Sequence, residues 1–375
     1  MPVRVLEAQP EGHPRVGSRA IFVHREALEL MESWHPGLGR RIASYGLTWH
    51  TKRTTWRGQD VFVRTYPCTA PDRLPPMSSL PQSTTEEVLT EACCQLGVEF
   101  IWNCAVADVT VADDHVVLTD TRGGMWKARH VIAADGPRSR VRETLGVRLE
   151  GDANPTQFVI VDAAEDPEDP RKQERVFHFA HPALGGRNLL TVPFAGGWRV
   201  DLQCLASDDV ATYGTGAGLR EWVGLALGPA YADRITWCST YTFSNLVANR
   251  MVDPSGRVLL IGDAAHLFAP FGARGMNSGF FDAYAGARAV VRAQRSPDPA
   301  SVRAAAEEFA NQRRQAALRN RAAAAAALSH MLPRRSMARL RVTAAAAVAR
   351  WGLRAGAWLD RGVYGPTRKP GASTY

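Results

Sequence analysis

The stretch from Gly256 to Gly279, GRVLLIGDAAHLFAPFGARGMNSG, constrains the fold of this chain more than any other. Val258 to Ile261 form a continuous apolar run, which is typical of a parallel strand buried on both faces. Gly262 then permits a turn, and Asp263 follows at the carboxyl end of the strand, where open α/β sheets place their ligands. The pattern predicts an α/β fold with a ligand site at this turn.

More glycines follow the turn and lead into a predicted helix. Gly272, Gly275 and Gly279 permit close approach of the backbone to a flat ligand. A helix that begins near Met276 presents free N–H groups and the positive end of its dipole, which favours an anion. The Asp263 carboxylate can accept two hydrogen bonds from vicinal hydroxyl groups. The combination predicts a nucleotide site.

This stretch resembles the GD motif of the class A flavin-dependent aromatic hydroxylases, the para-hydroxybenzoate hydroxylase family. The resemblance implies that Asp263, after Gly262, holds the ribityl hydroxyls of FAD, and that Pro270 lies against the reactive side of the isoalloxazine. Pro270 is therefore the one candidate catalytic residue. Ala269 departs from the family, which usually has a proline there. The backbone that would meet the pyrimidine end of the flavin is that of Gly275, Met276 and Asn277.

A second motif lies about 130 residues upstream, in RHVIAADGPRSRVRETLG from Arg129 to Gly146. A β-branched apolar strand again runs into an acid and a glycine, and then into a helix. By itself a strand followed by Asp-Gly is an ordinary turn. Together with the first motif it resembles the family's DG motif, which contacts both FAD and NAD(P)H. The candidate cofactor contacts are then Asp135, Gly136, Arg138 and Arg142.

The amino terminus reads as a strand that ends in an acid, Val3 to Glu7, followed by the helical stretch REALELMESW. In dinucleotide folds an Asp or Glu at the end of the second strand hydrogen-bonds the adenosine ribose, which makes Glu7 a candidate. Arg19 resembles the family arginine that reaches the pyrophosphate, and Gln82 belongs to a segment that resembles the one beside the flavin. The alternative for Glu7 and Arg19 is a solvated surface position.

The family begins with a strand, a G-x-G-x-x-G turn and a helix, and no such glycine pattern precedes Glu7. That strand occupies the middle of the sheet, so its loss leaves two rows of backbone groups unpaired. Each unsatisfied buried group costs about 1–3 kcal/mol, against a total stability of roughly 5–15 kcal/mol. We therefore expect this chain to fold poorly by itself. A missed gene start, a real truncation and an artefact of preparation stay open as explanations.

The hydrophobic pattern of the sequence changes in residues 151–250. Alternating stretches such as RVFHFA, NLLTVPFAG and WRVDLQCL predict an antiparallel sheet. In the family such a sheet forms the floor of a largely apolar pocket, and the aromatic ring of the substrate lies between it and the flavin. Side chains of these types are more often at the surface. The candidate polar contacts to the substrate are His178, Arg187, Arg199 and Gln203.

The chain has 375 residues, 45% of them hydrophobic and 22% charged, which suits a globular enzyme with two domains. We expect an α/β architecture: a Rossmann-like FAD-binding domain, incomplete at its N-terminus, in residues 1–150 and 251–300, an antiparallel β-sheet substrate domain in 151–250, and C-terminal helices in 301–375. No apolar stretch of transmembrane length and no secretory segment occurs, so a cytoplasmic location is the default. The six cysteines lack metal-ligand spacing, and no metal site is expected.

The net charge of +8 is concentrated near the carboxyl terminus, where residues 309–375 contain 12 Arg and one Lys against a single acid. An apolar stripe at helical spacing is formed by Met337, Leu340, Ala344, Val348, Trp351, Ala355 and Trp358. Off this stripe lie Arg335, Arg339, Arg350 and Arg354. We favour a helix that covers the sheet with solvated arginines. Peripheral contact with an anionic membrane or a partner is the alternative, and no nucleic-acid motif occurs.

The resemblance implies an FAD-dependent monooxygenase. NADH or NADPH would reduce FAD, dioxygen would give a flavin C4a-hydroperoxide, and one oxygen would pass to an aromatic, phenolic or polycyclic substrate. His266 is more typical of a structural residue than of an acid or base. Two alternatives remain: another flavin-dependent reaction, such as that of a reductase, halogenase or oxidative cyclase, and a flavin-free remnant that binds a partner through its basic tail.

Overall fold

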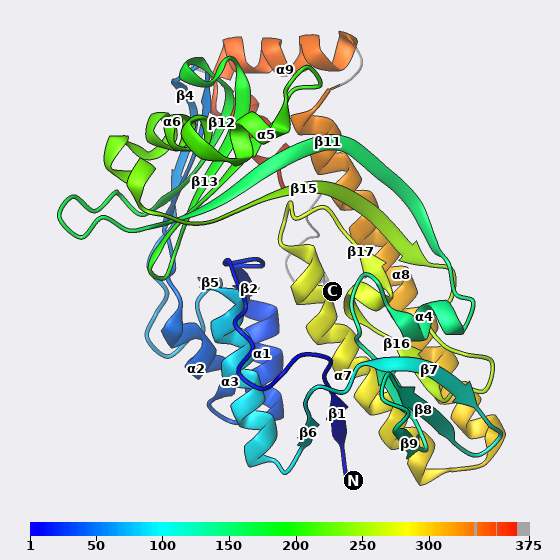
Figure 1. Ribbon diagram of the computed structural model, residues 1–375. Helices are drawn as coiled ribbons and strands as arrows, with labels where there is room; N and C mark the ends of the chain where they lie inside the picture. Colours follow the sequence, from blue (N-terminus) through cyan, green and yellow to red (C-terminus); the bar gives the residue numbers. More distant parts are fainter. Residues whose placement is uncertain (334–335, 350, 366–375) are drawn as a thin grey trace.

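The computed structural model describes residues 1–333, 336–349 and 351–365, and its architecture is mixed α/β, as predicted (Figure 1). A large curved sheet lies on one side of the molecule, and a group of helices and small sheets lies on the other. The long helix α8 (Pro299–Met331) runs from one part to the other.

The large sheet has the strand order β17-β15-β11-β14-β13-β12-β3-β4. Its strands are β3 (Thr51–Trp56), β4 (Gln59–Thr65), β11 (Leu149–Ala164), β12 (Glu174–His181), β13 (Arg187–Phe194), β14 (Gly197–Gln203), β15 (Ile235–Ala248) and β17 (His266–Leu267). The strands from β11 to β15 pair in antiparallel fashion, as the alternating pattern predicted. β3 and β4 extend this sheet from the first 150 residues, and β3 joins β12 in parallel, a contribution that the sequence did not reveal.

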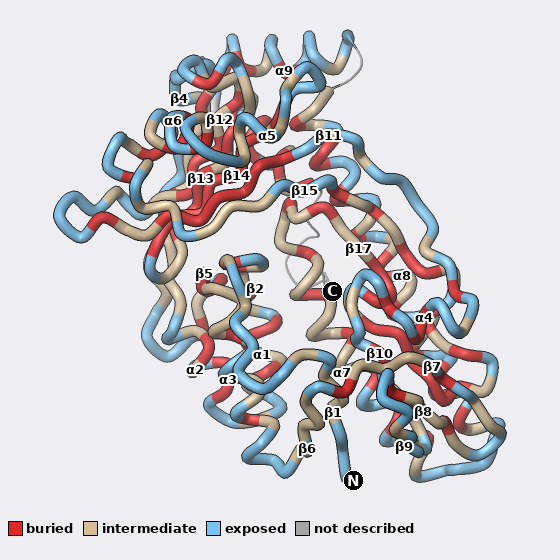
Figure 2. Tube along the Cα trace, viewed as in Figure 1, coloured by how far each residue is buried: buried red, intermediate tan, exposed pale blue. Residues whose placement is uncertain are grey.

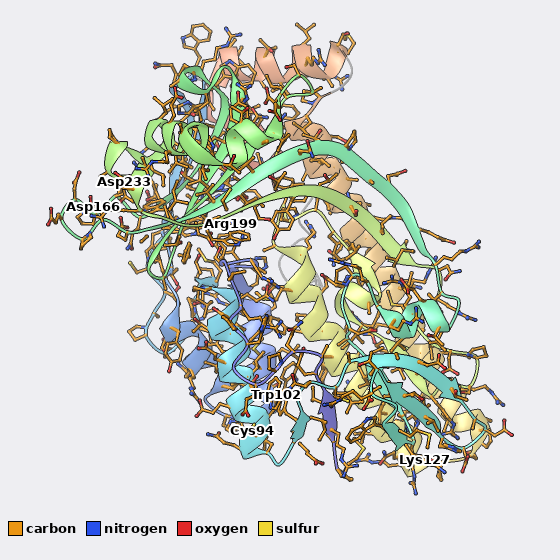
Figure 3. The ribbon with its side chains drawn as sticks, viewed as in Figure 1. Cys94, Trp102, Lys127, Asp166, Arg199 and Asp233 are labelled. Atoms are coloured by element: carbon orange, nitrogen blue, oxygen red, sulfur yellow. The ribbon has the colours of Figure 1, made fainter. Side chains whose placement is uncertain are left out.

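Strand β14 shows how the sequence separates the two faces of this sheet. Trp198, Val200 and Leu202 pack in a core cluster with α6 (Gly216–Leu227), because alternate side chains of a strand point to opposite faces. The intervening Arg199, Asp201 and Gln203 therefore belong to the other face. Figure 3 shows Arg199 below the sheet, toward the helical half of the molecule. The candidate site lies on that side.

Parallel pairing in the nucleotide region is limited to two pairs of strands. β1 (Arg4–Leu6) pairs with β6 (Glu99–Ile101), and β10 (Val131–Ala133) pairs with β16 (Val258–Leu260). In the part of the chain that the structure describes, no ladder joins β1 to β10. Each pair is a two-stranded sheet, so neither of its outer edges pairs with a further strand among the described residues. The expectation that the chain folds poorly by itself stays a prediction.

Smaller elements complete both halves of the molecule. The predicted stretch REALELMESW forms α1 (Arg25–Trp34), whose Leu28 and Met31 are fully buried. The other elements are α2 (Leu38–Tyr45), α3 (Gln82–Gln95), α4 (Arg140–Thr144), α5 (Val210–Gly214), α7 (Arg274–Arg295), β2 (Phe22–His24), β5 (Met77–Ser79), β7 (Val106–Val111), β8 (Val116–Asp120) and β9 (Met125–Ala128), with short 3₁₀ turns η1 (Pro182–Leu184), η2 (Pro229–Asp233) and η3 (Gly262–Ala264).

The carboxyl-terminal helices correct the predicted apolar stripe. The segment forms two helices, α9 (Ser336–Ala349) and α10 (Leu353–Gly362), instead of one. α9 buries Val342, Ala346 and Ala349, because small alanines let the helix approach the sheet closely. The exposed residues of the stripe are Met337, Leu340, Ala344, Val348, Trp351 and Trp358. Figure 2 shows much of α9 in the colour of exposed residues. Arg335 and Arg350 lie outside the described residues.

Candidate functional site

The turn after β16 begins the site. Gly262 adopts a φ of +54°, and its N–H donates to Oδ2 of Asp282 at 3.0 Å. Asp263 is accessible to solvent, yet the protein around it raises its pKa by desolvation, which the charge of His266 opposes. Nearby protein atoms thus disfavour the charged form of Asp263, although its side chain still reaches solvent. Such a group is available to hydroxyl donors.

Helix α7 starts close to this turn. An added Cβ at Gly279, in the second turn of α7, would lie 3.9 Å from Cα of Gly262, so the turn and the helix approach closely. The residue that precedes the helix, Ala273, has a φ of 51° and caps nothing with its side chain. The first N–H groups of α7, at Gly275 and Met276, consequently have neither a helical acceptor nor a side-chain cap.

Open space adjoins the glycines of both motifs. A Cβ added at Gly136, Gly262 or Gly275 would meet no atom within 4 Å. Pro270, the candidate next to the reactive part of the flavin, lies in the loop before α7, and its carbonyl accepts the N–H of Ala273 at 2.9 Å. Gly272 differs, because a Cβ added there would lie 3.1 Å from the carbonyl oxygen of Tyr364, so the loop itself is packed.

Both polar atoms of the Asn277 side chain form hydrogen bonds within the protein. Its Oδ1 accepts the N–H of His24 at 2.9 Å, and its Nδ2 donates to the carbonyl of Phe22 at 2.8 Å. Asn277 therefore ties β2 to the start of α7, and only its backbone remains for a ligand.

A network of three buried ionisable side chains holds the turn in place. Asp282 of α7 lies 2.6 Å from Nε2 of His266 and 2.6 Å from Nε of Arg313 on α8. All three side chains are less than 5% exposed. Although burial opposes it, His266 and Arg313 hold the pKa of Asp282 below its ordinary value. The structural reading of His266 agrees with this geometry, whereas sequence reasoning missed Asp282 and Arg313 because both lie in ordinary helical patterns.

In the second motif, Asp135 and Arg142 have protein partners. Asp135 accepts from the Ser139 hydroxyl at 2.5 Å and from the N–H of Val141 at 3.0 Å, so it caps α4. Arg142 is buried and donates to the carbonyl of Ala264 at 3.3 Å, which joins this motif to the first. Arg138 is exposed. Of the two arginines, the structure leaves Arg138 available for a cofactor.

The amino-terminal candidates lie at the ends of their elements, as expected. Glu7 follows β1 directly, and its Oε1 accepts the N–H of Gln9 at 2.9 Å while Oε2 lies 3.6 Å from Arg15. Gln82 begins α3, and its Oε1 accepts the N–H of Ala20 at 3.3 Å. Arg19 is exposed with a φ of 51°.

The loop that carries Arg19 is anchored on the large sheet. The N–H and hydroxyl of Ser18 bond to the two carboxylate oxygens of Asp162, at 2.5 and 2.6 Å. Arg199 donates to the carbonyl of Arg19, and its Nε donates to Asp201 at 2.9 Å. Arg199, a predicted substrate contact, is therefore committed to holding the loop of a predicted cofactor contact.

The other predicted substrate contacts divide between the two faces of the sheet. Gln203 lines a pocket beside Phe271, which follows Pro270. Arg187 instead pairs with Asp208 and lies over the ring of Tyr213, beside α5 and α6. His178 bonds to the Thr55 hydroxyl at 2.9 Å, and burial lowers its pKa to about 3. The structure does not bring Arg187 and His178 together with Gln203.

The pocket also reveals a polar residue that sequence reasoning missed. Asp201 lies two residues before Gln203 on β14, on the same face, and lines the same pocket. The pattern WRVDLQCL contained this signal, since Arg199, Asp201 and Gln203 alternate with apolar residues. The remaining pocket walls are mainly apolar and come from Phe158, Phe177, Leu189, Leu190, Phe271 and Met331, with Asn188.

Comparisons with known proteins agree with this arrangement. The model of a family described as "FAD binding domain" matches residues 2–320. The 6-methylpretetramide 4-monooxygenase of Streptomyces rimosus is 31% identical over 290 residues, which are 75% of this chain and 50% of that protein. The rifampicin monooxygenase of Streptomyces venezuelae is 30% identical over 296 residues, 75% of this chain and 58% of that protein. The chain thus spans about half the length of these curated relatives.

A solved structure shares the fold over nearly the whole chain. The p-nitrophenol 4-monooxygenase from Pseudomonas putida DLL-E4 superposes with a TM-score of 0.74 and 22% sequence identity. The superposition covers 98% of this chain and 93% of that one. The two-part architecture seen in Figure 1 is therefore a fold that this chain shares with that protein.

Proposed function

We propose that this chain, which belongs to the FAD-binding-domain family of class A flavoprotein monooxygenases, hydroxylates an aromatic, phenolic or polycyclic compound with FAD, dioxygen and NADH or NADPH. The relatives that it matches are monooxygenases by name, and this supports the reaction class. A cytoplasmic location belongs to the same proposal.

One observation carries the proposal: the solvent-accessible carboxylate of Asp263 lies beside an uncapped helix start, with open space at Gly262 and Gly275. A flavin needs an acceptor for its ribityl hydroxyls and donors for the oxygens of its pyrimidine ring. Asp263 supplies the first, and the N–H groups of Gly275 and Met276 supply the second. The residues present therefore fit FAD.

When bound, FAD accepts electrons from the reduced nicotinamide and activates dioxygen. The contribution of the protein is to position the bound groups and to place charge near them. The positive end of α7 favours negative charge near Gly275 and Met276. Phe271, which follows Pro270, lines a small and mainly apolar space on the face of the sheet. Apolar side chains around a bound ring exclude water. Glu7, Arg19, Gln82 and Arg138 are the proposed contacts for the remainder of the cofactors.

The test is a titration with FAD of the protein purified with any in-frame upstream residues retained. Flavin absorbance and fluorescence quenching report binding, and NADH or NADPH oxidation stimulated by phenolic compounds reports turnover. Asp263→Ala should weaken FAD binding at least about tenfold, because a hydrogen bond to a charged group contributes roughly 1.5–3 kcal/mol. Asp152→Ala, which changes an exposed carboxylate on β11, is the control.

Two outcomes count against the proposal. Protein that stays colourless and takes up no FAD is a flavin-free remnant. Protein that binds FAD and oxidises the nicotinamide but gives no oxygenated product by mass spectrometry is another flavoenzyme, such as a reductase.

A second proposal concerns the exposed face of α9, and we infer that it rests on an anionic membrane surface. Met337 and Leu340 are 65% and 60% exposed, on the side of α9 opposite its buried alanines. Arg339 and Arg341 are exposed on the same helix, so apolar contact and positive charge occur together. Within the described residues, no helix combines the length and apolar character needed to traverse a bilayer, so any such contact is peripheral.

Flotation with vesicles separates this surface from a protein interface. Vesicles that contain phosphatidylglycerol should retain the protein, whereas vesicles of phosphatidylcholine should not. Met337→Ser with Leu340→Ser should abolish retention, and Val291→Ser, which changes an exposed apolar residue on α7, should not. Equal retention by both lipids, or a dimer in sedimentation that the double substitution dissolves, contradicts the membrane proposal.

A further inference from the structure

We propose that a pocket between the edge of the large sheet and α10 binds a small organic phosphate through two arginines. The pocket has a volume of about 220 Å³, and none of its residues belongs to the motifs proposed for the flavin. β4 is the edge strand of the sheet, and Figure 1 shows it at the same end of the molecule as α9. The inference is independent of the proposed function. The residues that line the pocket are Lys52, Phe62, Arg64, Ala357, Asp360 and Arg361.

The pairing of β3 with β4 brings two cations together. The strands are antiparallel, and Lys52 lies directly opposite Arg64, while Thr54 lies opposite Phe62. Directly opposite residues share a face of the sheet, and Lys52 and Thr54 both bond to Asp360 of α10. All four side chains therefore belong to the face that α10 covers. Like charges in such a cross-strand pair are destabilising, so this face favours the approach of an anion.

One carboxylate of the protein offsets part of the positive charge. Asp360 is fully buried, and its Oδ2 accepts from Lys52. Its Oδ1 accepts from the Thr54 hydroxyl at 3.1 Å and lies 3.4 Å from Nη1 of Arg175. Both oxygens thus have donors, and two cations share a single negative charge. Among the described residues that line the pocket, no other is acidic.

The guanidinium groups of Arg64 and Arg361 carry the charge that remains. In the described part of the chain neither has a carboxylate partner. Arg64 lies over the ring of Tyr66, 4.7 Å from its centroid, and Nε of Arg361 donates to the carbonyl of Ala357 at 3.3 Å. Both arginines are exposed, so their other N–H groups are accessible to a ligand that enters from solvent. The pocket has three cationic side chains and one carboxylate, an excess of two positive charges.

A phosphate monoester fits this arrangement better than a carboxylate does. It carries about −1.5 to −2 charge at pH 7, which matches the excess, whereas a carboxylate would balance only half of it. Each guanidinium presents a planar set of donors that suits two phosphate oxygens at once. Phe62 offers an apolar surface to the organic part. The volume is below the roughly 300–1,000 Å³ of sites for drug-sized ligands, which favours a small ester.

Calorimetry with glycerol 3-phosphate tests the site in the protein prepared for the FAD titration, with and without FAD. The ionic strength is kept low, because salt screens exposed charges. The dissociation constant should be below about 1 mM, and glycerol, which lacks the phosphate, should not bind. Arg64→Met and Arg361→Met should each weaken binding about tenfold, since each removes hydrogen bonds to a charged group. Lys52 is left unchanged because it pairs with the buried Asp360.

Arg354→Met is the matched control. Arg354 is an exposed arginine of the same helix, and it does not line the pocket. All three variants lose one positive charge, so a general effect of net charge would weaken binding equally in each. Thermal unfolding of the variants identifies any that lose affinity through loss of the fold, and two pocket arginines give two separate tests. An equal loss of affinity in the control, or full affinity in both pocket variants, overturns the inference.

The phosphate can belong to a soluble compound or to a lipid headgroup, and flotation with vesicles that contain phosphatidic acid distinguishes the two. Retention that Arg64→Met and Arg361→Met abolish, and that Arg354→Met preserves, identifies a lipid headgroup. Binding of glycerol 3-phosphate without such retention identifies a soluble ester. Absence of binding in both assays overturns the inference. Flavin content, recorded in the same samples, shows separately whether the proposed function fails.

Discussion

Nε2 of His266 lies 2.6 Å from Oδ2 of Asp282, and the same oxygen accepts the backbone N–H of Gly262 at 3.0 Å. Asp282 thereby joins the turn after β16 to the middle of α7, and Arg313 joins both to α8. A single buried carboxylate thus holds the turn that carries Asp263, the proposed acceptor for the ribityl hydroxyls. The position of the turn depends on residues that touch no cofactor.

Removal of this carboxylate should be costly. Asp282→Asn leaves Arg313 buried without its counter-charge, and breaking a buried ion pair typically destabilises a protein by about 3–5 kcal/mol. Denaturant unfolding measures the loss, and FAD affinity should fall with it. Glu308→Gln removes one partner of the exposed Arg292–Glu308 pair and should cost less than about 1 kcal/mol. Similar losses in both variants would mean that the buried network does not fix the turn.

Gly17 provides a test of how the loop of Arg19 docks on the sheet. Its φ is +76°, and an added Cβ would collide with the ring of Trp237. Gly12 has a similar φ of +69°, but a Cβ there meets no atom within 4 Å. Gly17→Ala should therefore destabilise the protein by roughly 1–3 kcal/mol more than Gly12→Ala, because the backbone strain is common to both and only the overpacking differs. Thermal unfolding of both variants gives the comparison, and equal losses would show that the loop moves aside freely.

Variants of Arg142 and Arg138 should distinguish a role in stability from a role in cofactor binding. Arg142→Met leaves the buried carbonyl of Ala264 without its donor, which costs about 1–3 kcal/mol of stability. Arg138→Met changes an exposed residue and should leave the unfolding free energy within about 0.5 kcal/mol. If Arg138 contacts a cofactor, its variant raises KM for NADH or NADPH, or the Kd for FAD, while stability is unchanged. Full cofactor affinity in Arg138→Met would remove that residue from the proposed site.

His178 should make stability depend on pH. Burial, with the nearby His181 and arginines, lowers its pKa to about 3, whereas the unfolded chain binds the proton near 6.5. Between these values the unfolded state holds more protons, so stability is full above pH 6.5 and falls as the pH decreases below it.

The matching experiment is denaturant unfolding of the wild type and two variants at pH 7.5 and pH 5. His178→Asn should remove about 2 kcal/mol of the loss of unfolding free energy between these values. His13→Asn, in an exposed loop, should leave the pH dependence as it is. If the His178→Asn variant loses as much unfolding free energy between pH 7.5 and pH 5 as the wild type does, the pKa of this imidazole is not lowered in the folded protein.

Much of the nucleotide region followed from local patterns. The strand at Val258 to Leu260, the acidic turn and the helix start within two residues of Met276 were predicted because a buried parallel strand, a glycine turn and a helix terminus each leave a local signature. The antiparallel strands of residues 174–203 followed from alternation alone. Sequence placed Gln203 correctly on a strand of this sheet, but gave no way to choose it over Arg187.

The apolar stripe of the carboxyl-terminal segment shows where such reasoning fails. Periodicity identified a helix, but the face that packs is set by what lies opposite it, and the sheet accepts the small alanines while Met337 and Leu340 stay outside. Arg199, too, was expected to meet a substrate, and it bonds instead to a loop 180 residues away in the chain.

The amino-acid sequence alone determined the elements that depend on neighbours in the chain: the strands, the acidic turns, the start of α7 and the family they indicate. Only the tertiary structure decided which charged side chains pair with each other and which remain available to a ligand. Asp282 is enclosed by His266 and Arg313, while Asp263 still reaches solvent, and no local pattern distinguishes these two carboxylates. Their difference arises from burial and from partners distant in sequence, which exist only after the chain has folded.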